Sequence, residues 1–127
     1  MRAARPGSRW SGGRVLRRHR YTAYLRSDAW FRRRERWHAE YLETTGTDPV
    51  CAVCGRAWRL DRDDLHHRSY KHLGDEHHWD LTPLCRADHA ALHALWDACP
   101  SWRRLGRAQA TDGIIAILRR RPERRQP

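Results

Sequence analysis

Four residues with the spacing of metal ligands constrain most strongly how this chain can fold. Cys51 and Cys54 form a Cys-x2-Cys pair, and Cys85 is followed by Asp88 where a second pair would carry another cysteine. Zn²⁺ can bind three thiolates and one carboxylate in a tetrahedron. We therefore predict a structural zinc at Cys51, Cys54, Cys85 and Asp88, with Cys99 as the rival fourth ligand. The alternative is a group of buried free thiols without a metal.

Most of the histidines gather in one stretch, between residues 66 and 93, and predict a second metal site. His89 and His93 are four residues apart, so on a helix they share one face and can bind one ion. His66 and His67 are neighbours on a predicted strand, where successive side chains face opposite ways. One of them can bind a metal while the other, with an ordinary pKa of about 6.5, transfers a proton. The alternative is a histidine-rich loop that is merely polar.

The charge of the chain predicts a polyanionic partner. Lys and Arg total 26 against 15 Asp and Glu, a formal net charge of +11, and such a surface binds nucleic acid through its phosphates. All the basic residues except Lys71 are arginines, a bias that a G/C-rich genome also favours. No apolar run approaches the ~20 residues of a membrane span, and residues 1–20 lack the apolar core of a secretory signal. We therefore expect a cytoplasmic protein, in which cysteines favour metal ligation over disulfides.

One long helix is predicted before the cysteines. Ser27 has the side chain of an N-cap, and Gly46 permits the chain to end the helix, which we place over residues 28–44. An apolar and aromatic stripe follows the helical period, and we interpret it as core rather than as a base-stacking platform. Its members are Trp30, Arg34, Trp37 and Tyr41.

The remaining elements complete an α+β prediction. Residues 58–60 and 65–67 are predicted as two short strands joined by an acidic turn, and residues 68–84 mostly as loop. Helices are predicted over residues 86–98 and 112–120. Residues 1–20 carry many arginines and no acid, so we expect a disordered basic arm, and we expect a second basic tail over residues 119–127.

The combined motifs resemble the HNH, or His-Me finger, endonucleases. The similarity extends over residues 21–93, within a predicted domain of residues 21–118 whose motif core is residues 51–98. It begins with Tyr21-x2-Tyr24-Leu25-x-Ser27-x2-Trp30-x3-Arg34. It continues through Leu65-His66-His67-Arg68-Ser69-Tyr70, Leu73-Gly74-Asp75-Glu76, Asp80-Leu81-Thr82-Pro83-Leu84-Cys85, His89 and His93.

The resemblance implies a role for each matching residue. His66 and His89 correspond to ligands of the catalytic metal, and His93 to an additional ligand. His67 corresponds to the general base that activates water, and Asp80 stands where the family usually has an asparagine that braces the loop holding the base. The implied fold is a ββα-metal finger, with a preceding long helix, a zinc knuckle and C-terminal helices. Asp88 in place of a zinc cysteine and Asp80 in place of asparagine are the departures from the family pattern.

The function that the resemblance implies is hydrolysis of DNA phosphodiester bonds, either by nicking or by double-strand cleavage. It implies one catalytic divalent cation, which we expect to be Mg²⁺, Mn²⁺, Ni²⁺ or Zn²⁺, besides the structural Zn²⁺. The expected partner is double-stranded DNA with weak sequence preference, and the oligomeric state is left open with a monomer favoured. A phage or bacterial protein is a further candidate partner. The residues that we expect to contact nucleic acid are Arg68, Lys71, Arg32, Arg33 and Arg36.

Two alternatives to a DNA endonuclease remain open from the sequence. The first is a noncatalytic zinc module that binds nucleic acid, which would need the cysteines but none of the paired histidines. The second is an RNase of the same superfamily.

Overall fold

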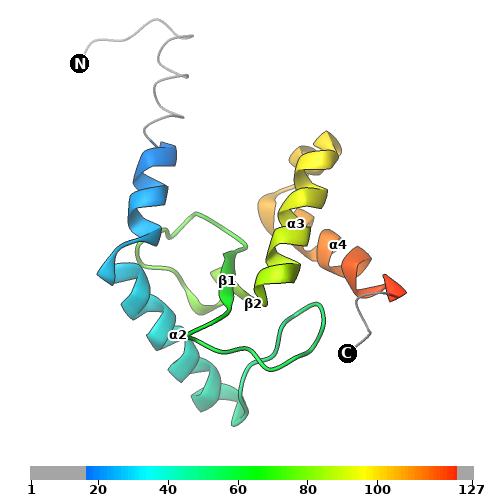
Figure 1. Ribbon diagram of the computed structural model, residues 1–127. Helices are drawn as coiled ribbons and strands as arrows, with labels where there is room; N and C mark the ends of the chain where they lie inside the picture. The colour runs from blue at the N-terminus through cyan, green and yellow to red at the C-terminus, as the bar shows by residue number, and fades with distance from the viewer. Residues whose placement is uncertain (1–16, 123–127) are drawn as a thin grey trace, which may run out of the picture.

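A two-stranded antiparallel sheet lies between helices on both sides in the computed structural model, which describes residues 17–122 (Figure 1). Strand β1, Asp64–His67, pairs with β2, Leu81–Leu84, so that His66 lies opposite Thr82 and His67 opposite Leu81. Helix α2, Asp28–Thr45, packs on one side, and α3, Arg86–Ala98, and α4, Arg107–Arg119, lie on the other. The α+β class predicted from the sequence is confirmed. No helix in this part of the chain has the length and apolar character to cross a bilayer.

Helix α2 begins and ends as its sequence predicts. The Ser27 side chain accepts a hydrogen bond from the Trp30 amide at 3.2 Å, which satisfies one of the free donors of the first turn. Gly46 ends the helix with φ of 74°, a conformation that costs glycine little. Residues 17–25 form another helical segment before α2, so residues 17–20 are helical although we predicted a disordered arm there. The rest of that arm, residues 1–16, lies outside the described residues.

The predicted pairing of two strands at residues 58–60 and 65–67 is wrong, because the partner of β1 is β2. The sequence of β2 was interpreted as loop because it contains Pro83, which has no amide hydrogen. The Pro83 carbonyl accepts a hydrogen bond from the Ala52 amide at 2.9 Å, outside the β1–β2 ladder. The backbone carbonyl and nitrogen of Pro83 therefore face away from β1. The N–H that proline lacks would not have formed a hydrogen bond in the sheet. Proline is tolerated here because β2 is an edge strand.

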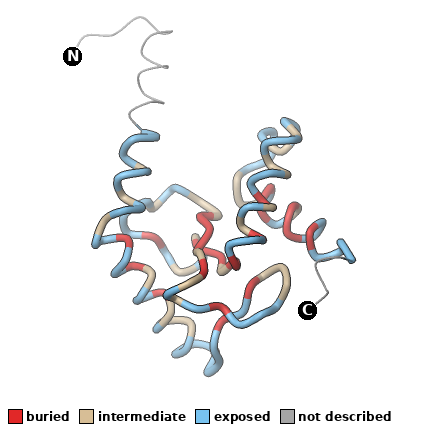
Figure 2. The backbone as a smooth tube through the Cα atoms, viewed as in Figure 1, coloured by how far each residue is buried: buried red, intermediate tan, exposed pale blue. Residues whose placement is uncertain are grey.

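Two hydrophobic clusters lie on opposite sides of the sheet (Figure 2). On the α2 side, Trp30 and Trp37 pack with residues of both strands, so the aromatic stripe is core, as predicted. On the other side, Leu92 of α3 packs against the apolar face of α4 and the end of β2. Burying such side chains is the main source of stability in a small domain. The sheet is thus held from both faces, with the alternating side chains of β1 divided between them.

The C-terminal helices agree with the sequence in one case and differ in the other. Helix α3 covers residues 86–98, as predicted. Helix α4 begins at Arg107 rather than near residue 112 and ends at Arg119, and residues 123–127 of the predicted tail lie outside the described residues. Gly113 lies in the middle of α4, where an added Cβ would stand 3.0 Å from the Trp102 ring. The close packing of Trp102 on the helix accounts for a glycine at a position that disfavours it.

Candidate metal centres and catalytic site

Three imidazoles converge between β1 and α3. His66 extends from the strand, and His89 and His93 extend from successive turns of the helix, so that one ring nitrogen of each lies within 4.8 Å of the others. The Nε2 atoms of His89 and His93 are 3.1 Å apart. The sequence predicted that these three residues share a site, and the structure brings them together.

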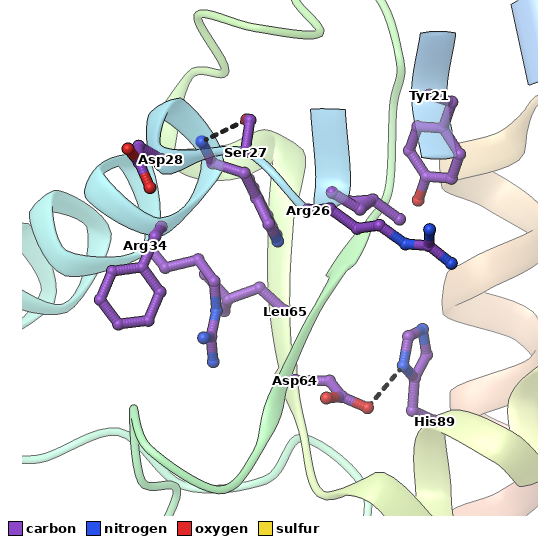
Figure 3. A pocket seen from close by; sticks show the side chains of 11 residues that line it. Tyr21, Arg26, Ser27, Asp28, Arg34, Asp64, Leu65 and His89 are labelled. Atoms are coloured by element: carbon purple, nitrogen blue, oxygen red, sulfur yellow. Dashed lines mark hydrogen bonds and ion pairs between the residues drawn. The ribbon is translucent and has the colours of Figure 1, made fainter. Parts of the chain in front are cut away.

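The other nitrogen of two of these rings is held by a hydrogen-bonding partner. His66 Nε2 lies 3.0 Å from the Thr111 hydroxyl of α4, while His66 Nδ1 is buried and makes no hydrogen bond within residues 17–122. His89 Nδ1 lies 2.9 Å from the Asp64 carboxylate (Figure 3). Because the Asp64 carboxylate accepts a hydrogen bond from His89 Nδ1–H, the lone pair of the neutral His89 ring is on Nε2. Partners of this kind orient the rings of metal ligands in proteins, yet nothing local in the sequence marked Asp64 or Thr111.

The surroundings keep two of the rings neutral, the form that binds metals. Burial, assisted by the charge of Arg107, lowers the pKa of His66 to about 2. Burial also lowers the pKa of His93, with His89 and Arg107 adding to the effect. A protonated imidazole must lose a proton before it can bind a cation. Because the pKa values of His66 and His93 are lowered, both rings are already neutral at neutral pH.

Arg107 places a positive charge beside the three imidazoles. Its Nε donates to the His67 carbonyl at 2.7 Å, and its guanidinium carbon lies 4.2 Å from the Tyr70 ring centre and 4.9 Å from that of Trp96. A guanidinium held between two aromatic rings is well placed to bind a phosphate beside a metal. The sequence did not single out Arg107, because its surroundings come from three segments of the chain.

His67 lies on the opposite face of β1, outside the group of three imidazoles. Its side chain is 1% exposed, its Nε2 lies 2.7 Å from a Glu76 carboxylate oxygen, and the Tyr21 hydroxyl lies 3.4 Å from its Nδ1. The ring also packs 4.8 Å from that of Trp30, measured between centroids. The side chains of His66 and His67 face opposite sides of β1, as predicted. Both ring nitrogens of His67, however, lie against other side chains, Nε2 against Glu76 and Nδ1 against Tyr21.

Glu76 is the centre of a buried polar network that the sequence did not reveal. Besides His67, it accepts a hydrogen bond from the Tyr24 hydroxyl at 2.8 Å. Burial opposes ionisation of Glu76, but the hydrogen bonds from His67, from the backbone and from Tyr24 outweigh it and hold the pKa below its usual range. The carboxylate therefore stays charged and fixes the orientation of the His67 ring.

The prediction that Arg33 faces solvent or DNA is wrong. Arg33 is 3% exposed, donates to the Glu76 carbonyl at 2.8 Å and pairs with Glu40 at 3.2 Å. Arg33 lies on the face of α2 that packs against the loop between the strands, and its guanidinium is engaged by Glu76 and Glu40. Arg32 and Arg36 are exposed, as expected.

The loop between the strands carries three other predicted site residues. Asp80 accepts a hydrogen bond from the His77 amide at 2.9 Å, and its own carbonyl accepts one from the Arg68 amide at 2.7 Å. Asp80 thus connects the two ends of the loop. The Arg68 side chain forms two hydrogen bonds to Asp112, at 2.6 and 3.0 Å, whereas Lys71 is exposed. The Arg68 charge is thus paired with an acidic residue of α4.

A second group of metal-ligand residues is compatible with a structural zinc. Ligand atoms of Cys51, Cys54, Cys85 and Asp88 lie within 4.8 Å of one another, and Asp88 Oδ2 is 3.3 Å from the sulfurs of both Cys51 and Cys85. Cys99 lies elsewhere, with its sulfur 3.6 Å from the Ser101 hydroxyl. The geometry thus favours Asp88 over Cys99 as the fourth residue. Burial raises the pKa of Cys85 to about 12, so this thiol releases its proton only when a cation replaces it.

A cavity of about 400 Å³ opens beside His89 (Figure 3). Its walls come from the helical segment 17–25, the start of α2, and β1, and His89 with its partner Asp64 lies at one side. Arg26 and Arg34 also line it. Solvent and small groups can therefore approach His89 from this side.

No family model, curated protein or solved structure matches this chain. What the protein does is therefore inferred from its own residues.

Proposed function

We propose that this protein is a metal-dependent endonuclease of the HNH type that hydrolyses phosphodiester bonds of double-stranded DNA. The observation that carries the proposal is the convergence of His66, His89 and His93. Thr111 and Asp64 hydrogen-bond the second nitrogen of the first two rings. The charge of Arg107 lies close to the group. In a chain of net charge +11, a metal site next to a fixed arginine suits a phosphate substrate.

The proposed catalytic cation is held by His66 Nδ1, His89 Nε2 and His93 Nε2. The buried His66 Nδ1, which lacks a hydrogen bond within the described residues, is then satisfied by the ion. When bound, the cation supplies Lewis-acid stabilisation of the negative charge that develops on the phosphate. Three imidazoles favour Mn²⁺, Ni²⁺ or Zn²⁺ over Mg²⁺. In this reading β1, β2 and α3 form the ββα-metal finger.

His67 is the proposed general base, oriented by Glu76. With Nε2 engaged by the carboxylate, Nδ1 is the nitrogen left to take a proton from water. The Tyr21 hydroxyl lies at a long 3.4 Å from that atom and occupies the position of a water molecule. The proposal therefore requires Tyr21 to leave Nδ1 when substrate binds, which the neighbouring cavity leaves room for. An imidazole base oriented by a carboxylate is a common arrangement for activating a nucleophile, here water.

Arg107 and the exposed basic residues hold the DNA in this proposal. Arg107 binds the phosphate next to the metal, and Arg32, Arg36 and Lys71 contact the backbone around it. Contacts to the DNA backbone carry no sequence information, so we propose weak sequence preference. We also propose that the protein acts as a monomer and nicks one strand. The zinc at Cys51, Cys54, Cys85 and Asp88 holds α3 against the turn at residues 51–55 and has no part in the chemistry.

One observation favours a second candidate, a noncatalytic metal-binding module for nucleic acid. His67 is buried and fully hydrogen-bonded, as a purely structural histidine would be. Under that alternative the three imidazoles bind a structural ion, and no substitution changes a cleavage rate.

A supercoiled-plasmid assay separates the candidates. The protein is tested with EDTA and with a panel of divalent metals, beside His89→Ala and, as a matched control outside the metal groups, His38→Ala. We expect nicking that requires a metal, survives in His38→Ala and is lost in His89→Ala while the variant still binds DNA. Absence of nicking with every metal would reject the endonuclease proposal, and faster cleavage of matched single-stranded RNA would assign the site to an RNase.

A further inference from the structure

We propose a third metal site, formed by His72, His77 and Asp80 in the loop between β1 and β2, which binds a divalent transition-metal ion. It is separate from the three imidazoles and from the cysteine group, and it does not depend on the proposed nuclease activity. One ligand atom from each residue lies within 4.8 Å of the other two. Two imidazoles and a carboxylate are a donor set that Zn²⁺, Ni²⁺ and Cu²⁺ accept readily.

Backbone geometry brings the three residues together before any ion binds. The loop reverses direction at Gly74, where φ is 98°, and this brings the His72 and His77 rings face to face with centroids 3.6 Å apart and planes 15° from parallel. The Asp80 carboxylate is anchored by the His77 amide at 2.9 Å and reaches His72 Nδ1 at 2.9 Å. A prearranged set of donors lowers the entropy cost of binding.

The carboxylate of the group favours a cation. Burial opposes ionisation of Asp80, but hydrogen bonds from the His77 backbone and the His72 ring hold its pKa below the usual range. The carboxylate is thus negative. The stacked rings of His72 and His77 place ring nitrogens beside this anion, and His72 Nδ1 lies 2.9 Å from it. One divalent ion satisfies both rings and the carboxylate.

The site is also accessible. His77 is exposed, and His72 and Asp80 are half-buried, so an ion can enter from solvent and keep water in its remaining coordination positions. Mg²⁺ and Ca²⁺ prefer oxygen donors and should not compete. An ion here would join the two halves of the loop on either side of Glu76, the partner of His67.

The test counts metal ions. Protein that carries one equivalent of zinc, the amount the cysteine group binds, is titrated with Ni²⁺ by calorimetry, and the wild type is compared with His77→Ala, with His89→Ala and with the control His38→Ala. His77 is exposed and its ring stacks on His72 at the surface of the loop, so we expect its replacement to leave the fold in place. We expect His77→Ala to lose one equivalent of bound Ni²⁺, His89→Ala to lose a different one, and the double variant to lose both.

A second readout locates the ion. The ring protons of His72 and His77 should broaden in NMR spectra as paramagnetic Ni²⁺ is added to His89→Ala, which lacks the three-imidazole site. Equal Ni²⁺ stoichiometry in the wild type and His77→Ala, or no broadening of these two rings, would overturn the proposal and leave His72 and Asp80 as a simple ion pair. Neither outcome bears on plasmid cleavage.

Discussion

Replacing Thr111 by valine tests whether the second nitrogen of a metal-binding imidazole needs its partner. Thr111 is 0% exposed, and its hydroxyl lies 3.0 Å from His66 Nε2. Valine keeps nearly the same shape but removes the oxygen, so the change acts on one hydrogen bond. If the cation binds His66 through Nδ1, as proposed, the ring then loses the contact that holds its proton on Nε2.

The size of the effect follows from that hydrogen bond. Removing an outer partner of a metal-binding histidine typically weakens metal binding about 10- to 100-fold, which corresponds to roughly 1.4–2.7 kcal/mol. The buried Nε2–H would also remain unpaired, at a cost of about 1–3 kcal/mol. We therefore expect the free energy of unfolding to fall by about 1–3 kcal/mol and the metal affinity to fall about 10- to 100-fold.

The assay is a calorimetric titration of Thr111→Val with Ni²⁺ or Mn²⁺, beside thermal unfolding. Thr82→Val is the matched control, because Thr82 is also buried and lies opposite His66 on β2, whereas the hydrogen bond to the His66 ring comes from Thr111. The control should bind metal as the wild type does. Wild-type affinity in Thr111→Val would refute the claim that the hydroxyl sets the donor atom of His66.

Three further predictions concern the same region. Arg107→Ala should reduce plasmid nicking about 100-fold and lower the salt dependence of DNA binding by about one phosphate contact. Glu76→Gln should reduce nicking by about 10²–10⁴ while calorimetry shows unchanged metal binding. Because the pKa of His66 falls to about 2 on folding, the unfolded chain takes up a proton below pH ~6.5 that the folded protein refuses. Stability of the metal-stripped protein in urea should therefore fall by about 1 kcal/mol per pH unit below that value, and His66→Gln should lack this dependence.

Signals that act within one turn or one helix were predicted correctly. Ser27 and Gly46 bound α2 because a cap acts on amides and carbonyls a few residues away. The spacing of His89 and His93 placed both on one face of α3 because the helical period does so in any context. The cysteine pair formed a tight turn in the same way.

Errors arose where a residue's partner lies far along the chain. Pro83 marked β2 as loop, although the strand forms with its open edge toward Ala52. Arg33 was assigned to solvent, because the helical period alone did not show that the loop carrying Glu76 folds over that face. Residues 58–60 were predicted to pair with β1, but Trp58 and Leu60 instead pack in the hydrophobic cluster on the α2 side.

The sequence by itself determined which residue types lie close together within short segments: the cysteine turn, the histidine pairs, the long helix and the positive charge. Only the tertiary structure decided which atoms face one another, including Thr111 on His66, Asp64 on His89, and Glu76 on His67. The physical reason is range. Backbone periods and caps act over a few residues, whereas a ring's tautomer and charge depend on whichever distant segment packs against it.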